Sequence, residues 1–162
     1  ARRAGAQGMS EVAGPRVLTL DARTLGAGDI SALREHARRQ GAALGLAHRS
    51  RSYRFPYALV AAHSTDVGVD IELVEPPDER FARSICTPDE LASIDDLLSA
   101  PDGVSSLWSS KEALAKALGD ALNYDPRRLP GPALWPNGEG GAWSARRAPA
   151  PEGHVAWVVW RA

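Results

Sequence analysis

Two kinds of hydrophobic spacing run along the chain, and together they predict both strands and helices. Short apolar runs or alternating positions, typical of strands, occur at 17–20, 44–47, 57–62, 67–73, 142–148 and 154–161. Apolar positions at helical spacing occur at 29–40, 78–85, 88 to about 98, and 104–118. The strands and helices do not alternate strictly. We therefore expect an α+β fold with an antiparallel sheet and packed helices.

Length and turn signals favour one domain. The chain has 162 residues, and residues 17–162 contain no long linker and no short repeat. Residues 1–16 are expected to be a flexible N-terminal stub. The chain does not begin with methionine, and we expect either that Met9 is the original start or that the chain is a domain cut from a larger protein.

Composition excludes several classes of protein. Hydrophobic residues make up 44% and charged residues 24%, as in soluble globular proteins. No apolar run approaches the roughly 20 residues of a membrane helix, and because no apolar stretch follows Arg2 and Arg3 we expect no secretory signal. Cys86 is the only cysteine, which excludes an intrachain disulfide and a thiolate metal cluster. We expect a cytoplasmic protein with no membrane partner.

The net charge of −1 hides a strong asymmetry. Residues 1–60 carry a net charge of +6 and residues 61–120 one of −9, which suits an anionic ligand held together with a metal cation. A pI near 6.5 argues against a nucleic-acid partner. Seventeen of the nineteen bases are arginine, and the two lysines, Lys111 and Lys116, share one segment. This bias suggests that a compact ammonium charge is needed there.

Residues 67–73 form the clearest predicted strand. Alternation places Gly68, Asp70 and Glu72 on one face, with the carboxylates about 7 Å apart along the strand. Gly68 leaves that face open to a ligand or to another backbone. Paired carboxylates suit a hard divalent cation such as Mg²⁺. The alternative is a solvated edge strand whose acids point outward.

The predicted helix at 104–118 carries a second polar pattern. Trp108, Glu112 and Lys116 form a stripe at positions i, i+4 and i+8. The leucines expected to pack against the rest of the protein are Leu107, Leu114 and Leu118. Taken alone, the stripe also fits an ordinary surface Glu–Lys pair worth about 0.3–0.5 kcal/mol.

Together, the two segments resemble the signature of the 4′-phosphopantetheinyl transferase family. That family has a strand V-G-[IV]-D-I-E and, about forty residues later, a helix W-[ST]-x-K-E-[AS]-x-x-K. Here residues 67–72 read V-G-V-D-I-E, and residues 108–116 read W-S-S-K-E-A-L-A-K. Two motifs in this order and at this distance are far more specific than either alone. The capping box at 87–90 between them also looks like part of the family's insert.

The resemblance implies a fold and an activity. The fold would be 4′-phosphopantetheinyl transferase-like and closer to the surfactin-type class than to the trimeric holo-acyl-carrier-protein synthases. Residues 17–66 would be an abbreviated first half and residues 67–162 a complete second half. The activity would be transfer of phosphopantetheine from coenzyme A to a serine of an apo acyl or peptidyl carrier protein, with release of adenosine 3′,5′-bisphosphate. The partner could belong to fatty-acid, polyketide or nonribosomal-peptide synthesis.

Matching positions also imply site residues. Asp70, Glu72 and Glu112 would bind Mg²⁺, or Mn²⁺ in its place. Glu112 would accept the proton of the carrier serine directly or through a metal-bound water, and Lys116 would contact the pyrophosphate of coenzyme A. Lys111 would either contact a phosphate or have a structural role.

The surfactin-type class also has a Ser-His pair before a strand, and this histidine contacts the 3′-phosphate of coenzyme A. His48 matches the histidine, but Ala47 stands where the serine is expected. We expect Arg49, Arg51 or Arg54 to replace the missing contact, because a guanidinium binds phosphate through two hydrogen bonds. His48, Arg49 and Arg51 are therefore expected to contact coenzyme A.

Two other functions fit parts of the pattern. A non-catalytic domain that docks carriers or coenzyme A in a larger synthase would bind coenzyme A without turnover. A metal-dependent hydrolase of nucleotide pyrophosphates would release adenosine bisphosphate from coenzyme A with no carrier present. The intact set of three acids and Lys116 favours the transferase.

Overall fold

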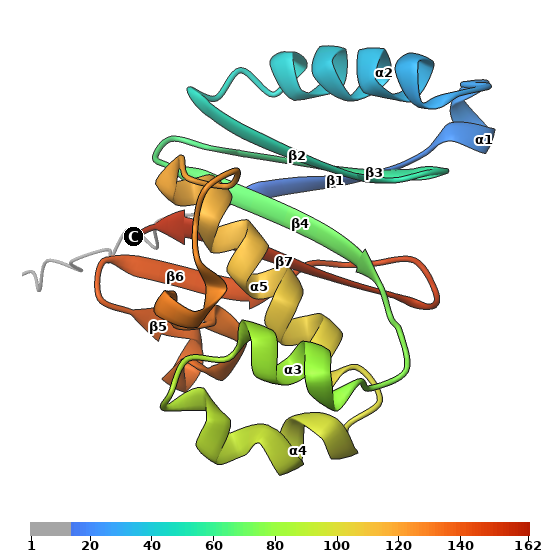
Figure 1. Cartoon of the computed structure of the whole chain (residues 1–162). Coiled ribbons are helices and arrows are strands. Elements are labelled where there is room, and N and C mark those ends of the chain that lie inside the picture. Colours follow the sequence, from blue (N-terminus) through green and yellow to red (C-terminus); the bar gives the residue numbers. More distant parts are fainter. Residues whose placement is uncertain (1–13) are drawn as a thin grey trace, which may run out of the picture.

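The structure, a computed structural model of the chain, describes residues 14–162. Most of the predicted N-terminal stub, residues 1–13, lies outside the described residues. The described part consists of two antiparallel sheets and the helices packed on them, which confirms the α+β class (Figure 1). None of the helices within residues 14–162 is long and apolar enough to cross a membrane.

The first sheet has three strands in the order β1-β3-β2, and a helix covers one of its faces (Figure 1). Its strands are β1 (Arg16–Asp21), β2 (His48–Arg54) and β3 (Tyr57–His63), and its helices are α1 (Ala22–Leu25) and α2 (Ile30–Ala43). The Asp29 side chain accepts a hydrogen bond from the Ala32 amide and so caps α2. Leu33 of α2 is fully buried in a cluster with Val60 of β3.

The hydrophobic pattern did not predict strand β2, although the family resemblance implied a strand after His48, and the expected extended segment at 44–47 is wrong. Helix α2 continues to Ala43, and Gly45 then turns the chain with a left-handed φ of 68°. The strand begins only at His48, and its sequence H-R-S-R-S-Y-R has no apolar alternation. Its inner positions carry small hydroxyl side chains instead, because they meet β4 (Val67–Leu73) through hydrogen bonds.

The second sheet has four strands in the order β4-β7-β6-β5, and its pairs are antiparallel. The strands other than β4 are β5 (Glu139–Gly140), β6 (Trp143–Arg147) and β7 (His154–Arg161). Helix α5 (Gly103–Leu118) crosses the face formed by β4 and β7, and α3 (Glu79–Ile85) and α4 (Ile94–Ser99) pack at one end of it (Figure 1). These strands lie within one or two residues of the predicted ones, apart from the short β5.

The capping box at 87–90 is present, but the helix after it is shorter than predicted. The Thr87 amide donates to Glu90 Oε1 at 2.8 Å, and the Glu90 amide donates to Thr87 Oγ1 at 3.2 Å. The first turn, Glu90–Ser93, is a 3₁₀ helix, and the α-helix α4 spans only Ile94–Ser99. Helix α4 ends just before the turn at 101–103, which leads into α5.

Strand β4 is buried on both faces, so the alternative of a solvated strand is wrong. Val69 and Ile71 lie in a core cluster with Leu59 of β3 and Val158 of β7. On the opposite face, α5 covers the strand. Of the leucines expected to pack, Leu107 and Leu114 are buried, whereas Leu118, the last residue of α5, is half exposed.

Candidate active site

The backbone of α5 lies directly on β4 at Gly68. A Cβ atom at Gly68 would lie 1.9 Å from the Ala113 carbonyl oxygen and 2.6 Å from the Ala117 amide nitrogen. Only glycine allows this approach. Gly68 therefore makes room for the backbone of α5, which is one of the two possibilities, a ligand or another backbone, that its position suggested. The contact brings Glu112 and Lys116, the neighbours of these alanines in sequence, close to the acids of β4.

Asp70 is the most buried acid of the site. Its Oδ1 atom accepts a hydrogen bond from Ser52 Oγ at 3.2 Å and lies 3.3 Å from Lys116 Nζ. Its Oδ2 atom is buried and has no hydrogen-bond partner among residues 14–162. Burial raises the pKa of Asp70 to about 8, the Lys116 ammonium acts in the opposite direction, and the Glu72 and Glu112 carboxylates raise the pKa further. The site is thus short of positive charge around Asp70.

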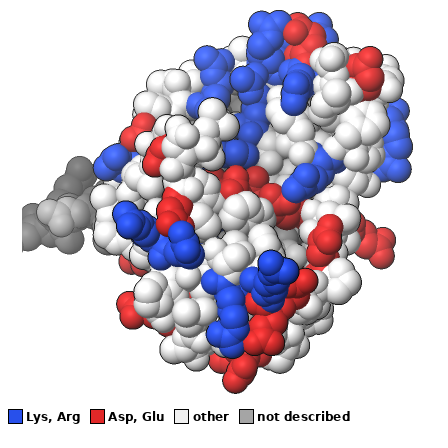
Figure 2. Space-filling view, viewed as in Figure 1, with Lys and Arg blue, Asp and Glu red and all other residues white. Residues whose placement is uncertain are grey.

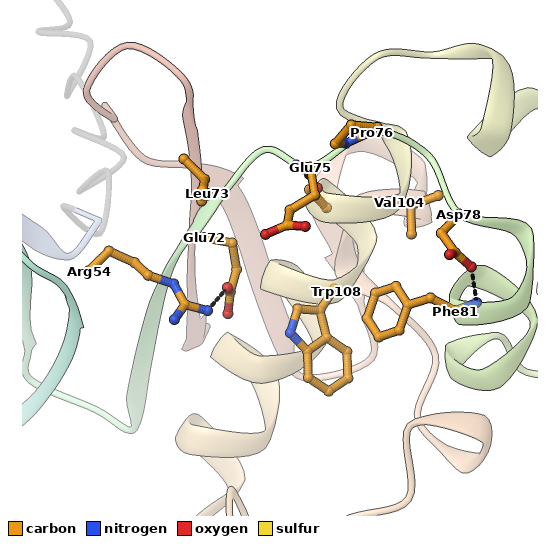
Figure 3. Close-up of a pocket in the computed structure, with 10 residues that line it drawn as sticks. Arg54, Glu72, Leu73, Glu75, Pro76, Asp78, Phe81, Val104 and Trp108 are labelled. Atoms are coloured by element: carbon orange, nitrogen blue, oxygen red, sulfur yellow. Dashed lines mark hydrogen bonds and ion pairs between the residues drawn. The ribbon is translucent and has the colours of Figure 1, made fainter.

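Glu72 lies two residues further along β4 on the same face and pairs with Arg54. The Arg54 guanidinium, at the end of β2, donates to Glu72 Oε2, and this hydrogen bond raises the pKa of Arg54 (Figure 3). The Glu72 side chain is only 12% exposed. Arg54 was expected near a phosphate of coenzyme A, and the structure places it instead on a predicted metal ligand.

Glu112 projects from α5 and accepts a hydrogen bond from the hydroxyl of Tyr124. Burial, followed by the contact with Glu112, raises the pKa of Tyr124, so the phenol stays protonated and donates. Tyr124 lies in the turns after α5, outside both motifs. Nothing in the spacing of the sequence marked it, because a single tyrosine among turn residues carries no periodic signal.

Lys116 lies at the junction of the two sheets. Its ammonium donates to the Val69 carbonyl of β4 at 2.9 Å and to the Arg51 carbonyl of β2 at 3.3 Å, besides its ion pair with Asp70. The side chain is 23% exposed. A cation that is held by carbonyls and still reaches solvent can attract an anionic ligand at the seam between the sheets.

Lys111, the other lysine, is enclosed in the protein. Its fully buried ammonium lies 2.5 Å from Glu90 Oε1 and donates to the carbonyls of Ile85 and Pro126 at 2.6 and 2.8 Å. The second oxygen of Glu90 accepts the Gly131 amide at 2.7 Å. This placement supports the structural role for Lys111 over the contact with a phosphate. The lysine ties α5 to the end of α3 and to the turns after α5.

The Glu72 and Glu112 carboxylates act electrostatically on Asp70, but each of the three acids is bound to a different side chain of the protein. Asp70 pairs with Lys116, Glu72 with Arg54 and Glu112 with Tyr124. As the side chains stand, residues 14–162 contain no group of three or more His, Cys, Asp or Glu side chains placed to hold a metal ion. The donor chemistry nevertheless fits a hard divalent cation, because carboxylate oxygens are its preferred ligands and one of them, Asp70 Oδ2, is buried without a partner.

A basic concavity opens beside Lys116, between α2 and β2. It has a volume of about 640 Å³, and its basic lining residues are Arg34, Arg38, Arg49, Arg51 and Lys116. Figure 2 shows blue side chains gathered over this part of the molecule, above a red patch at the middle of the same face. The site thus joins a positive hollow to a negative centre.

His48 lies at the edge of the same region. Its Nδ1 atom is 3.3 Å from Asp66 Oδ1 and the side chain is partly exposed. A smaller hollow of about 300 Å³ is lined by both His48 and Arg49, and also by Lys116. The structure therefore brings His48, Arg49, Arg51 and Lys116 together, as the expected contacts of one ligand require.

A second pocket, of about 460 Å³, opens on the other side of Glu72 (Figure 3). Its floor includes the rings of Phe81 and Trp108, which meet edge to face at a centroid distance of 5.6 Å. Glu72 and Glu75 provide charge at its rim. The acidic centre is thus flanked by a basic concavity and by a second pocket that combines aromatic rings with charged side chains.

Acids from a strand and a helix thus lie near both a basic concavity and a second pocket. A family model described as the 4′-phosphopantetheinyl transferase superfamily matches residues 66–147, half of the chain and both motifs. The chain belongs to this superfamily, which confirms the resemblance seen in its sequence. A separate search of curated protein sequences found no match to the chain.

Proposed function

We propose that the protein transfers 4′-phosphopantetheine from coenzyme A to a serine hydroxyl of an apo acyl or peptidyl carrier protein, with Mg²⁺ or Mn²⁺ as cofactor. The observation that supports this most directly is the meeting of Asp70, Glu72 and Glu112 with Lys116 beside the basic concavity. The reaction forms a bond between the serine oxygen and the β-phosphorus. It breaks the pyrophosphate bond and releases adenosine 3′,5′-bisphosphate.

Glu112 is the candidate general base. Its carboxylate acts electrostatically on Asp70 of β4, and Trp108, one turn earlier on α5, lines the second pocket, through which a serine hydroxyl would approach. The serine proton moves to the Glu112 carboxylate as the new oxygen–phosphorus bond forms. Lys116 stabilises the negative charge that grows on the departing bisphosphate, because its ammonium is fixed by the Val69 carbonyl before the ligand arrives.

Asp70, Glu72 and Glu112 would hold the divalent cation. When bound, the ion would neutralise charge on the pyrophosphate during phosphoryl transfer. The unpartnered Oδ2 atom of Asp70 supports this assignment, since a buried carboxylate oxygen without a partner is costly. Arg54 donates a hydrogen bond to Glu72 at the entrance of the second pocket.

The nucleotide end of coenzyme A would lie in the basic concavity. Arg49 and Arg51 replace the hydroxyl that is missing at Ala47, and His48 lies next to them. Lys116 lines both the concavity and the smaller hollow, so the pyrophosphate would connect the two ends of the ligand at the seam. The arginine-rich first half of the chain would thus serve the substrate's phosphates.

The function is tested by incubating the protein with coenzyme A, Mg²⁺ and a panel of apo carriers from fatty-acid, polyketide and nonribosomal-peptide synthesis. We expect one carrier to gain the mass of one phosphopantetheine group and adenosine 3′,5′-bisphosphate to appear in equal amount. Bisphosphate release without any carrier would overturn the proposal in favour of a hydrolase. Coenzyme A binding that chelators leave unchanged, with no turnover on any carrier, would overturn it in favour of a docking domain.

Replacing both Arg49 and Arg51 with alanine should raise the KM for coenzyme A about tenfold or more and change kcat little. Each guanidinium would lose a charge-assisted hydrogen bond to phosphate, and such bonds are worth about 1.5–3 kcal/mol. Steady-state kinetics with varied coenzyme A measures the effect. Arg16→Ala, an exposed arginine at the start of β1, is the control. An unchanged KM would show that the concavity does not bind the substrate.

Mg²⁺ should stabilise the protein more at pH 8.5 than at pH 6. Because burial in the folded protein raises the pKa of Asp70 from 3.8 to about 8, the metal-free protein loses stability as the pH rises from about 4 to about 8, so less of this stability remains at pH 8.5 than at pH 6. A bound cation compensates the charge. At about a hundredfold excess over its Kd the ion contributes about 2.7 kcal/mol, or a Tm increase of roughly 5–10 °C at pH 8.5.

The measurement is a thermal unfolding curve at each pH, with EDTA or with Mg²⁺. Asp70→Asn is the matched variant, because it keeps the shape of the side chain and removes its titration. In Asp70→Asn the Mg²⁺-dependent increase in Tm should shrink at both pH values. An equal Mg²⁺ effect on the wild-type protein at pH 6 and pH 8.5 would contradict the prediction.

A further inference from the structure

Tyr124 reaches the predicted general base from outside both motifs. Its hydroxyl donates to Glu112 Oε1, and its ring stacks on Trp108 with a centroid distance of 6.4 Å and an interplanar angle of 27°. Trp108 belongs to the same helix as Glu112, one turn earlier. The tyrosine is therefore fixed against the helix by its ring and meets the carboxylate with its hydroxyl.

The backbone around Tyr124 is held on both sides. Its amide donates to the Asp120 carbonyl at 3.2 Å, just after α5 ends. Two residues beyond it, the Pro126 carbonyl accepts a hydrogen bond from the buried ammonium of Lys111 at 2.8 Å. Lys111 itself is fixed by Glu90. The segment that carries Tyr124 is thus attached to α5 at two adjacent residues. Lys111 donates to the Pro126 carbonyl, and Glu112 accepts from the Tyr124 hydroxyl.

We propose that Tyr124 is a positioning residue that engages one oxygen of the Glu112 carboxylate and leaves the other to face Asp70 and the reacting groups. This inference rests on the proposed function. A carboxylate with two unengaged oxygens rotates and can bind a cation through both. A carboxylate with one oxygen held by a phenol presents a single oxygen in a defined direction. Hydrogen-bond partners of metal-binding carboxylates typically contribute 10–100-fold to metal affinity or activity.

Tyr124→Phe is the direct test, because it removes the hydroxyl and keeps the stacked ring. Binding of Mn²⁺ alone, measured by electron paramagnetic resonance, should weaken about tenfold. In the transfer assay kcat should fall by a similar factor, while the KM for coenzyme A stays within about twofold, because the basic concavity is unaltered. Tyr57→Phe is the matched control: it removes a hydroxyl that accepts from Arg23 at 2.9 Å.

A double-mutant cycle separates positioning from a merely structural effect. If Tyr124 acts through Glu112, adding Tyr124→Phe to Glu112→Gln should not weaken Mn²⁺ binding further. A second loss of about tenfold in the double variant would overturn the positioning role. The cycle is read on the metal alone, so it does not depend on a carrier or on turnover.

The failure of this inference can be told apart from failure of the proposed function. If the wild-type protein transfers phosphopantetheine and Tyr124→Phe equals it in kcat and in Mn²⁺ affinity, the role of Tyr124 is overturned and the function stands. If the wild-type protein modifies no carrier, the function fails. In that case, a lower Mn²⁺ affinity of Tyr124→Phe that vanishes in the Glu112→Gln background still supports the contact.

Discussion

Glu112→Gln should lower the rate of phosphopantetheine transfer about a thousandfold or more. The substitution keeps the size of the side chain and an oxygen that can still accept from Tyr124. It removes the negative charge and the site that takes the serine proton, and a general base alone contributes about 10²–10⁴-fold. Loss of a cation ligand adds to the effect. The rate is measured as the increase in carrier mass with time under saturating coenzyme A and Mg²⁺.

The matched control is Glu152→Gln, which removes the same charge from an exposed turn between β6 and β7. This variant should transfer at the wild-type rate. Glu112→Gln should still bind coenzyme A, because Lys116 and the arginines of the concavity are unchanged. Retention of more than about a tenth of the wild-type rate in Glu112→Gln would exclude Glu112 as the base.

Gly68→Ala should strongly lower the free energy of unfolding, although it adds only one methyl group to the site. Its Cβ would lie 1.9 Å from the Ala113 carbonyl oxygen and 2.6 Å from the Ala117 amide, and both are backbone atoms that cannot rotate away. Helix α5 must therefore move off β4. Overpacking typically costs 1–3 kcal/mol, so a clash with backbone should lower the free energy of unfolding by about 3 kcal/mol or more.

The change in stability is measured by urea unfolding at equilibrium. Gly28→Ala is the control, since a Cβ there meets nothing within 4 Å and the residue has no left-handed φ. It should leave the free energy of unfolding unchanged or raise it slightly. Transfer activity should also fall in Gly68→Ala, because Glu112 and Lys116 move with the helix. Wild-type stability of Gly68→Ala would refute the close approach of α5 to β4.

The elements that carry the acids were predictable from local pattern. Strand β4 has the predicted bounds of 67–73, because its alternation is regular and Pro76 follows soon after it. Helix α5 begins one residue before the predicted start and ends before Gly119, which adopts the left-handed conformation of a helix stop. The contact between β4 and α5, by contrast, is not encoded locally. It was predictable only because the two motifs together match a family signature.

Other parts of the site gave no signal in the sequence. Strand β2 lacks apolar alternation because hydrogen bonds, not a hydrophobic face, join its inner side to β4. The interior position of Lys111 depends on Glu90, Ile85 and Pro126, which lie 21, 26 and 15 residues away in the chain. Tyr124 reaches Glu112 only because the turns after α5 fold back along the helix. Such contacts are tertiary, and spacing along the chain does not encode them.

The junction between β2 and β4 is made by side chains. Ser50 Oγ accepts the Val69 amide at 3.0 Å, and Ser52 Oγ accepts the Ile71 amide at 3.1 Å. Within a sheet, hydrogen bonds survive nearly any substitution, because almost every amino acid supplies the same peptide groups. Between β2 and β4, two hydrogen bonds depend instead on serine hydroxyls, which a single substitution removes. The junction between the two sheets therefore depends on side chains that mutation can replace, whereas the pairing within either sheet depends on the backbone.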